Sequence, residues 1–157
     1  MKKSDYIEEI VKVLNKYLEK FDLTCFYDDE FAYYYASSRI SFSFVCSEKS
    51  NREFSEVCAA LRPEVKADIF LLSIFHEIGH NESYDDLSDK DIDYSQDMKS
   101  CLNMKDDMDR MLYYTLPDEK AATLWGLDYM INNREEVEEL WNTIQPLIMK
   151  YYESVEV

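Results

Sequence analysis

The sequence predicts a mostly helical α+β domain that contains a small three-stranded antiparallel sheet. Three observations support this class. The first segment spaces its apolar residues as an amphipathic helix does, residues 23–46 contain short runs rich in Tyr, Phe, Thr and Val, and the pattern from residue 51 onward is helical. The chain has 157 residues, 46% of them hydrophobic, which suffices for a single domain over residues 1–157 with a sizeable core.

The N-terminal segment, residues 4–21, is predicted to form a helix that buries one face. Its apolar side chains recur at intervals of three and four residues, as the helical period requires. They are Ile7, Ile10, Val11, Leu14, Tyr17, Leu18 and Phe21.

Three strands are predicted next, over residues 23–27, 31–36 and 39–46. Asp28-Asp29-Glu30 and Ser37-Ser38 separate them with residue types that favour turns. In the third run, Ile and Phe alternate with Ser, so the apolar side chains should point to one face of the sheet. We therefore expect an antiparallel meander.

Helices are predicted for most of the remaining chain, with segments at residues 63–81, 89–113, 117–132 and 135–153. Pro63 stands where the first turn of a helix tolerates proline. Pro146 lies inside the last segment and is expected to kink or divide it, because proline lacks an N–H and its ring crowds the preceding turn.

The chain is strongly acidic, with 17 Lys and Arg against 33 Asp and Glu and a formal net charge of -16. This charge argues against direct binding to nucleic acid or to an anionic membrane surface. No stretch reaches the roughly 18 apolar residues of a spanning helix, and the N-terminus lacks the pattern of a signal peptide. We therefore expect a cytoplasmic protein whose four cysteines, which form no Cys-x-x-Cys pair, stay reduced.

The two histidines of the chain lie in one short motif, His76-Glu77-Ile78-Gly79-His80. Residues four apart on a helix are stacked one turn above the other, so both imidazoles can reach a single metal ion. Glu77 follows the first histidine and can lie beside the open position of the metal, where it would act as a general base. The motif therefore predicts Zn²⁺ as the cofactor, with His76 and His80 as ligands.

A catalytic zinc ion needs a third protein ligand, and the residue type that remains available is a carboxylate. The segment from Leu116 to Gly126 opens a helix after a proline and places Glu119 in its first turn. Ala122 and Gly126 are small, so this helix can approach another closely. The alternative is that Glu119 only stabilises the helix dipole.

His76-Glu77-Ile78-Gly79-His80, followed by Glu119-x-x-Ala122, resembles the gluzincin metallopeptidases, and most closely the small ImmA/IrrE-type domains. The resemblance implies a zincin-like domain in which the sheet packs near the motif helix, His76, His80 and Glu119 bind zinc, and Glu77 is the catalytic base. The chain departs from the family at Thr123, where Asn or Asp is usual, so the group that orients a ligand is not identified. Asp86 is the competing third ligand, by comparison with the longer metzincin motif.

The function predicted from these residues is hydrolysis of a peptide bond in a protein or peptide substrate by a metal-activated water. By resemblance to the ImmA/IrrE group, a transcriptional repressor is one candidate substrate. Four tyrosines in or near the motif segments could supply a hydrogen-bond donor to the reacting carbonyl: Tyr84, Tyr113, Tyr114 and Tyr129. The alternative from another class is a non-catalytic acidic protein that imitates nucleic acid when it binds its partner, which the net charge alone motivates.

Overall fold

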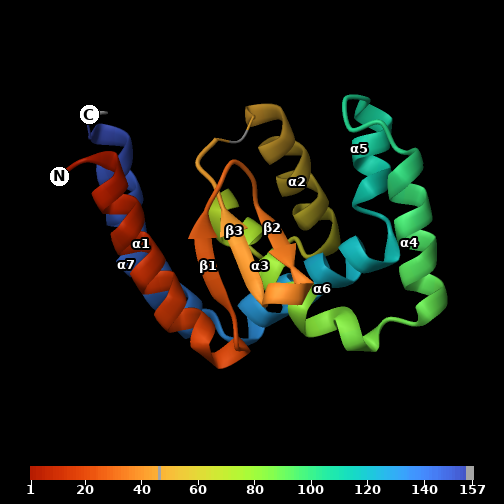
Figure 1. Ribbon diagram of the computed structural model, residues 1–157, viewed down its shortest axis with the longest axis horizontal. Coiled ribbons are helices and arrows are strands. Elements are labelled where there is room, and N and C mark those ends of the chain that lie inside the picture. The colour runs from red at the N-terminus through yellow and green to blue at the C-terminus, as the bar shows by residue number, and fades with distance from the viewer. Residues whose placement is uncertain (46, 155–157) are drawn as a thin grey trace. The chain divides into compact units, whose positions relative to one another are not determined.

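The computed structural model describes residues 1–45 and 47–154 and confirms a mostly helical α+β fold. Among these residues there are seven α-helices and one three-stranded sheet (Figure 1). The chain forms two compact units, one from residues 1–45 with the C-terminal segment that begins at Asn132, and one from the intervening residues up to Ile131. The sequence-based expectation of a single domain stays a prediction.

The first unit contains two long helices, α1 (Lys3–Leu18) and α7 (Arg134–Glu153), which lie side by side (Figure 1). They run antiparallel, because Lys3 donates a hydrogen bond to the carbonyl of Tyr151 while Tyr17, at the other end of α1, donates one to Glu136. The buried side chains of the two helices are Ile10, Leu14, Leu18, Val137, Leu140 and Ile144. The predicted amphipathic N-terminal helix is thus confirmed.

The sheet of the first unit is mixed rather than purely antiparallel, so the predicted meander is wrong. Its strands are β1 (Thr24–Tyr27), β2 (Ala32–Tyr34) and β3 (Arg39–Phe42), in the order β1-β3-β2. β3 pairs antiparallel with β2, as expected, but parallel with β1. The reason is that β3 is buried on both faces and takes the centre, and its Ser41 hydroxyl donates a hydrogen bond to the Glu30 carbonyl in the β1–β2 connection.

The second unit begins with α2 (Glu48–Leu61) and α3 (Ile69–Ser83). The predicted start of the second of these helices, at residue 63, is wrong. Pro63 does not open a helix; it follows the end of α2, and residues 63–68 are not helical. The start of α3 is marked by Asp68, whose carboxylate accepts a hydrogen bond from the Phe70 N–H. This side-chain cap satisfies an N–H group that has no partner inside the helix.

The predicted helix over residues 89–113 is two helices, α4 (Asp89–Cys101) and α5 (Asp107–Tyr113). The break arises because the backbone of Leu102 is extended and Asp106 caps α5 by accepting a hydrogen bond from the Asp109 N–H. Asp at this position favours the start of a new helix over continuation of the old one.

The last two predicted helices are confirmed with small differences in their bounds. α6 spans Pro117–Asn132, and α7 begins at Arg134. Pro146 lies within α7, which continues past it as one helix, so the predicted division does not occur, and the predicted kink stays a prediction. The helix is held on both sides of the proline, by the buried Ile144 before it and by Tyr151 after it, whose ring lies 4.5 Å from that of Phe44.

No helix in the described part of the chain is long and apolar enough to span a membrane.

Candidate metal site

The motif helix α3 is buried over most of its surface, as its all-round apolar sequence predicts. The motif lies in this buried part of the helix, and its first two residues, His76 and Glu77, are 7% and 6% exposed. His80, one turn further, keeps 17% of its side chain exposed. Both imidazoles therefore lie inside the protein, with access to solvent on the His80 side.

Two glycines allow α3 and α6 to approach each other closely. A Cβ atom at Gly79, inside the motif, would lie 2.1 Å from the carbonyl oxygen of Ala122 on α6. A Cβ atom at Gly126 on α6 would lie 2.7 Å from the carbonyl oxygen of Phe75 on α3. The expectation that small residues let the Glu119 helix approach another helix is thus confirmed, and Gly79 contributes to it from the motif side.

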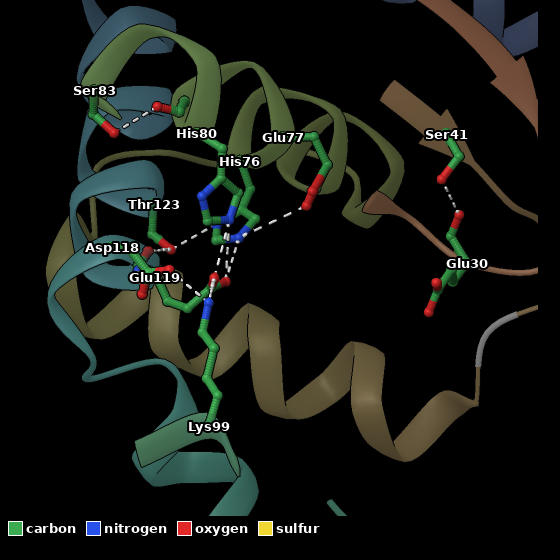
Figure 2. Close-up of polar contacts among 11 residues, drawn as sticks. Glu30, Ser41, His76, Glu77, His80, Ser83, Lys99, Asp118, Glu119 and Thr123 are labelled. Carbon is green, nitrogen blue, oxygen red and sulfur yellow. Dashed lines mark hydrogen bonds and ion pairs between the residues drawn. The ribbon is translucent and has the colours of Figure 1, made fainter. Parts of the chain in front are cut away.

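The close approach brings His76, His80 and Glu119 together (Figure 2). The Glu119 Oε1 atom lies 3.0 Å from His76 Nε2 and 3.2 Å from His80 Nε2, and the ligand atoms of the three residues lie within 4.8 Å of one another. Two ligands of a tetrahedral zinc ion, each about 2.0 Å from the metal, are about 3.3 Å apart. The distances from Glu119 to the two imidazoles are therefore close to what one metal ion requires.

The competing ligand Asp86 is not part of this cluster. It lies in η3 (Tyr84–Asp86), directly after α3, and its side chain is exposed. The turn that would return this segment to the histidines is absent, because the backbone of Ser83 stays helical, with φ -97° and ψ -8°. Of the two carboxylates considered from the sequence, Glu119 is the one that the fold brings to the imidazoles.

Thr123 on α6 orients the His76 ring. Its hydroxyl lies 2.9 Å from the Glu119 carbonyl and 2.9 Å from His76 Nδ1. A carbonyl can only accept, so the single hydroxyl proton goes to Glu119 and the Thr123 oxygen accepts from the His76 Nδ1–H. With Nδ1 donating to Thr123, His76 Nε2 faces Glu119 Oε1, where either a proton on Nε2 or a metal ion in its place can link the two atoms.

Glu77 lies on the opposite side of the imidazoles from Thr123 (Figure 2). Its Oε1 atom is 3.9 Å from His76 Nε2, and its Oε2 atom is buried with no hydrogen-bond partner among the described residues. Burial raises the pKa of the Glu77 carboxyl, although the two histidines oppose the shift. A buried carboxylate oxygen without a partner is costly unless a further group binds there.

The charges of the three side chains stabilise one another. Burial alone would raise the pKa of Glu119, but its hydrogen bonds to His76 and His80 outweigh burial and hold that pKa well below its usual range. Burial likewise would lower the pKa of His80, and the Glu119 carboxylate more than reverses this. Glu119 is therefore ionised at neutral pH, as a metal ligand must be.

Lys99 on α4 is part of the site and was not predicted from the sequence. Its ammonium lies 2.8 Å from Glu119 Oε2 and 2.5 Å from Asp118 Oδ2 (Figure 2). Burial would lower the pKa of Lys99, but these two carboxylates raise it above its ordinary value, so the side chain stays charged. The sequence around Lys99 does not indicate that this side chain would face a glutamate of another helix.

The site carboxylates affect the titration of two candidate tyrosines, Tyr113 and Tyr114. Burial and the negative charges nearby raise the pKa of Tyr114 to about 12, and the pKa of Tyr113 is raised as well. The Phe54 ring lies between Tyr114 and His76, with ring centroids 5.2 Å and 5.3 Å away. Both phenols stay protonated at neutral pH and can act as hydrogen-bond donors.

No protein-family model matches the chain, and neither a curated protein nor a solved structure does. The site therefore stands on its own geometry. His76, His80 and Glu119 form a buried candidate metal site, with the donor types that suit Zn²⁺ and with an orphaned carboxylate oxygen beside it.

Proposed function

We propose that the protein is a zinc-dependent metallopeptidase of the gluzincin type that hydrolyses a peptide bond in a protein or peptide. In this proposal His76, His80 and Glu119 hold the metal and Glu77 is the catalytic base. The observation that carries it is the convergence of two Nε2 atoms and one carboxylate oxygen beside the partnerless Oε2 of Glu77. A purely structural cluster would leave no reason to bury that oxygen without a partner.

A bound Zn²⁺ would supply Lewis acidity, lowering the pKa of a water molecule toward neutrality and polarising the carbonyl of the substrate. Residues of the chain would carry out the proton transfers. Glu77, whose pKa is raised by burial, accepts a proton from the attacking water and passes it to the amine that leaves. Thr123 keeps His76 in the tautomer whose Nε2 can bind metal.

The oxygen of the reacting carbonyl also needs a hydrogen-bond donor. Tyr113 and Tyr114 are the donors proposed for this role, because burial and the negative charges of Glu119 and Glu77 raise the pKa of both hydroxyl groups, as expected for groups near the site. The net charge of -16 favours a substrate with basic residues by complementarity. The motif resemblance to ImmA/IrrE-type domains adds a transcriptional repressor as a candidate substrate.

The test combines metal analysis with peptide hydrolysis in four proteins: wild type, Glu77→Gln, Glu119→Ala and Asp86→Ala. We expect about one zinc per chain in the wild type, Glu77→Gln and Asp86→Ala, and loss of zinc in Glu119→Ala. Hydrolysis should persist in Asp86→Ala, the exposed-carboxylate control, and disappear in Glu77→Gln.

A wild type that binds no zinc after repletion would refute the peptidase proposal. The acidic binding protein would then be the remaining explanation, and its binding to a nucleic-acid-handling partner should weaken steeply with salt and ignore chelators. Loss of zinc from Asp86→Ala with retention in Glu119→Ala would refute the assignment of the third ligand.

A further inference from the structure

We infer that Lys99 is a positioning residue that restricts Glu119 to one metal-binding oxygen, and so keeps a position on the metal open for the reaction. The inference rests on the proposed function and assigns a role to a side chain that the sequence motif does not include. It follows from how the two oxygens of the Glu119 carboxylate are shared between their neighbours.

The histidines alone do not decide how Glu119 would bind a metal ion. His80 Nε2 lies almost equally far from the two carboxylate oxygens, 3.2 Å from Oε1 and 3.1 Å from Oε2. His76 Nε2 lies 3.0 Å from Oε1. With no other partner, the carboxylate could rotate slightly and present both oxygens to the same ion.

Lys99 removes this freedom, because its ammonium donates a hydrogen bond to Oε2 at 2.8 Å. Such charge-assisted hydrogen bonds are about twice as strong as neutral ones. Oε2 is thereby committed to the lysine, and Oε1, which faces both imidazoles, is left as the metal-binding oxygen.

The lysine is itself held in place by two further contacts. Asp118, the neighbour of Glu119 on α6, accepts a second hydrogen bond at 2.5 Å, and the ring of Tyr113 lies with its centroid 5.2 Å from the ammonium. The Lys99 side chain is 30% exposed, against 3% for Glu119, so the ammonium reaches inward from the surface to the buried carboxylate. A freely moving surface lysine would not make these three contacts together.

A restricted carboxylate has two chemical consequences. Three protein ligands with one atom each leave a fourth position of a tetrahedral zinc ion available, whereas a bidentate glutamate would crowd it. The ammonium also withdraws negative charge from Glu119, so the carboxylate neutralises less of the charge of the metal. Groups that contact a ligand rather than the metal tune it in this way.

The experiment uses Co²⁺, whose visible d–d bands weaken when its coordination number rises from four to five. Wild type, Lys99→Met, Lys99→Arg and Lys90→Met are loaded with Co²⁺. Lys90 is an exposed lysine of the same helix and supplies the matched control. We expect one Co²⁺ per chain in all four, weaker visible bands in Lys99→Met alone, and spectra like that of the wild type in Lys99→Arg and Lys90→Met. Peptide hydrolysis by the zinc form of Lys99→Met should fall by about 10–100-fold.

An unchanged spectrum in Lys99→Met would overturn the inference. So would loss of Co²⁺ from folded Lys99→Met, because the lysine would then be required to form the site rather than to limit it. Far-ultraviolet circular dichroism checks folding, and Lys99→Ala replaces Lys99→Met if the latter does not fold. If the wild type itself binds neither Co²⁺ nor Zn²⁺, the proposed function fails. If the wild type binds metal and the spectrum of Lys99→Met is unchanged, only the inference about Lys99 fails.

Discussion

Replacing Gly79 by Ala tests whether the candidate site depends on the close contact of α3 with α6. The added Cβ would lie 2.1 Å from the Ala122 carbonyl oxygen, and ordinary contact begins at 3.4 Å, so the two backbones must separate by about 1.3 Å. The neighbour is backbone and cannot rotate away. Glu119 is on the same helix as Ala122 and would be carried away from the histidines.

The expected change in stability combines two opposing contributions. Overpacking of a core costs about 1–3 kcal/mol, and replacing Gly by Ala inside a helix returns about 1 kcal/mol. Because the clash is with backbone, we expect the upper end, a net decrease of about 2 kcal/mol in the free energy of unfolding. For a chain of this size this lowers Tm by about 4–8 °C.

The assay is urea unfolding together with zinc titration. Gly126→Ala is the graded comparison, because its Cβ would lie 2.7 Å from the Phe75 carbonyl oxygen and needs a smaller separation. Its net cost should stay below about 1 kcal/mol. Gln96→Ala, at an exposed position of α4, is the control and should leave both measurements unchanged. A Gly79→Ala protein as stable as the wild type, with unchanged zinc affinity, would refute the reasoning.

Four further outcomes are expected. Thr123→Val should weaken zinc binding by about 10–100-fold in calorimetric titration while Thr123→Ser retains it, and equal affinities would exclude the orienting role. In EDTA, Glu77→Gln should be more stable than the wild type at pH 7, because folding raises the pKa of Glu77 and disfavours its ionised form. The difference in stability between Glu77→Gln and the wild type should shrink as the pH falls toward the unfolded-state pKa of about 4.3. A difference that stays constant with pH would contradict the raised pKa of Glu77. Removing zinc should lower Tm, since free zinc at 100 times its Kd stabilises by about 2.7 kcal/mol; an unchanged Tm would indicate that the folded state does not bind it. A thiol reagent at pH 8 should label the exposed Cys101 and leave Cys25 and Cys58 unmodified, because burial raises the pKa of both thiols to about 12. Labelled Cys25 or Cys58 in a peptide map would contradict this expectation.

The candidate site was largely predictable because its main signals are local. The two histidines are one helical turn apart, and a helix forms wherever the apolar spacing and a cap such as Asp68 favour it. Glu119 was a candidate because Pro117 marks the start of its helix and the small residues after it allow close packing, and the resemblance of Glu119-x-x-Ala122 to a known motif favoured it as the ligand. These features depend on neighbouring residues along the chain.

The strand order could not be predicted in the same way, because it depends on contacts between segments. Short connections suggested that β1 and β2 are neighbours, yet the burial of both faces of β3 favours a central strand with a partner on each edge. The hydrogen bond from Ser41 to the Glu30 carbonyl satisfies a polar group in the connection, and nothing in the local sequence indicates it. The half of the sheet formed by a local hairpin, β2 with β3, was predicted correctly.

The side chains that support the cluster were harder to identify than the cluster itself. Thr123 differs from the residue usual in gluzincins, and only the three-dimensional structure shows its hydroxyl between the Glu119 carbonyl and the His76 ring. Lys99 lies twenty residues before Glu119, on a helix that the sequence pattern does not separate from the next one. Interactions of this kind have no fixed spacing along a chain.

Both histidines of the chain belong to the cluster, so any signal specific to histidine reports on the site alone. In nitrogen-15 magnetic resonance spectra, every imidazole resonance would arise from the site, with no background from other histidines. The chemical shifts of the ring nitrogens would therefore show directly which tautomer each ring adopts and when a metal ion arrives.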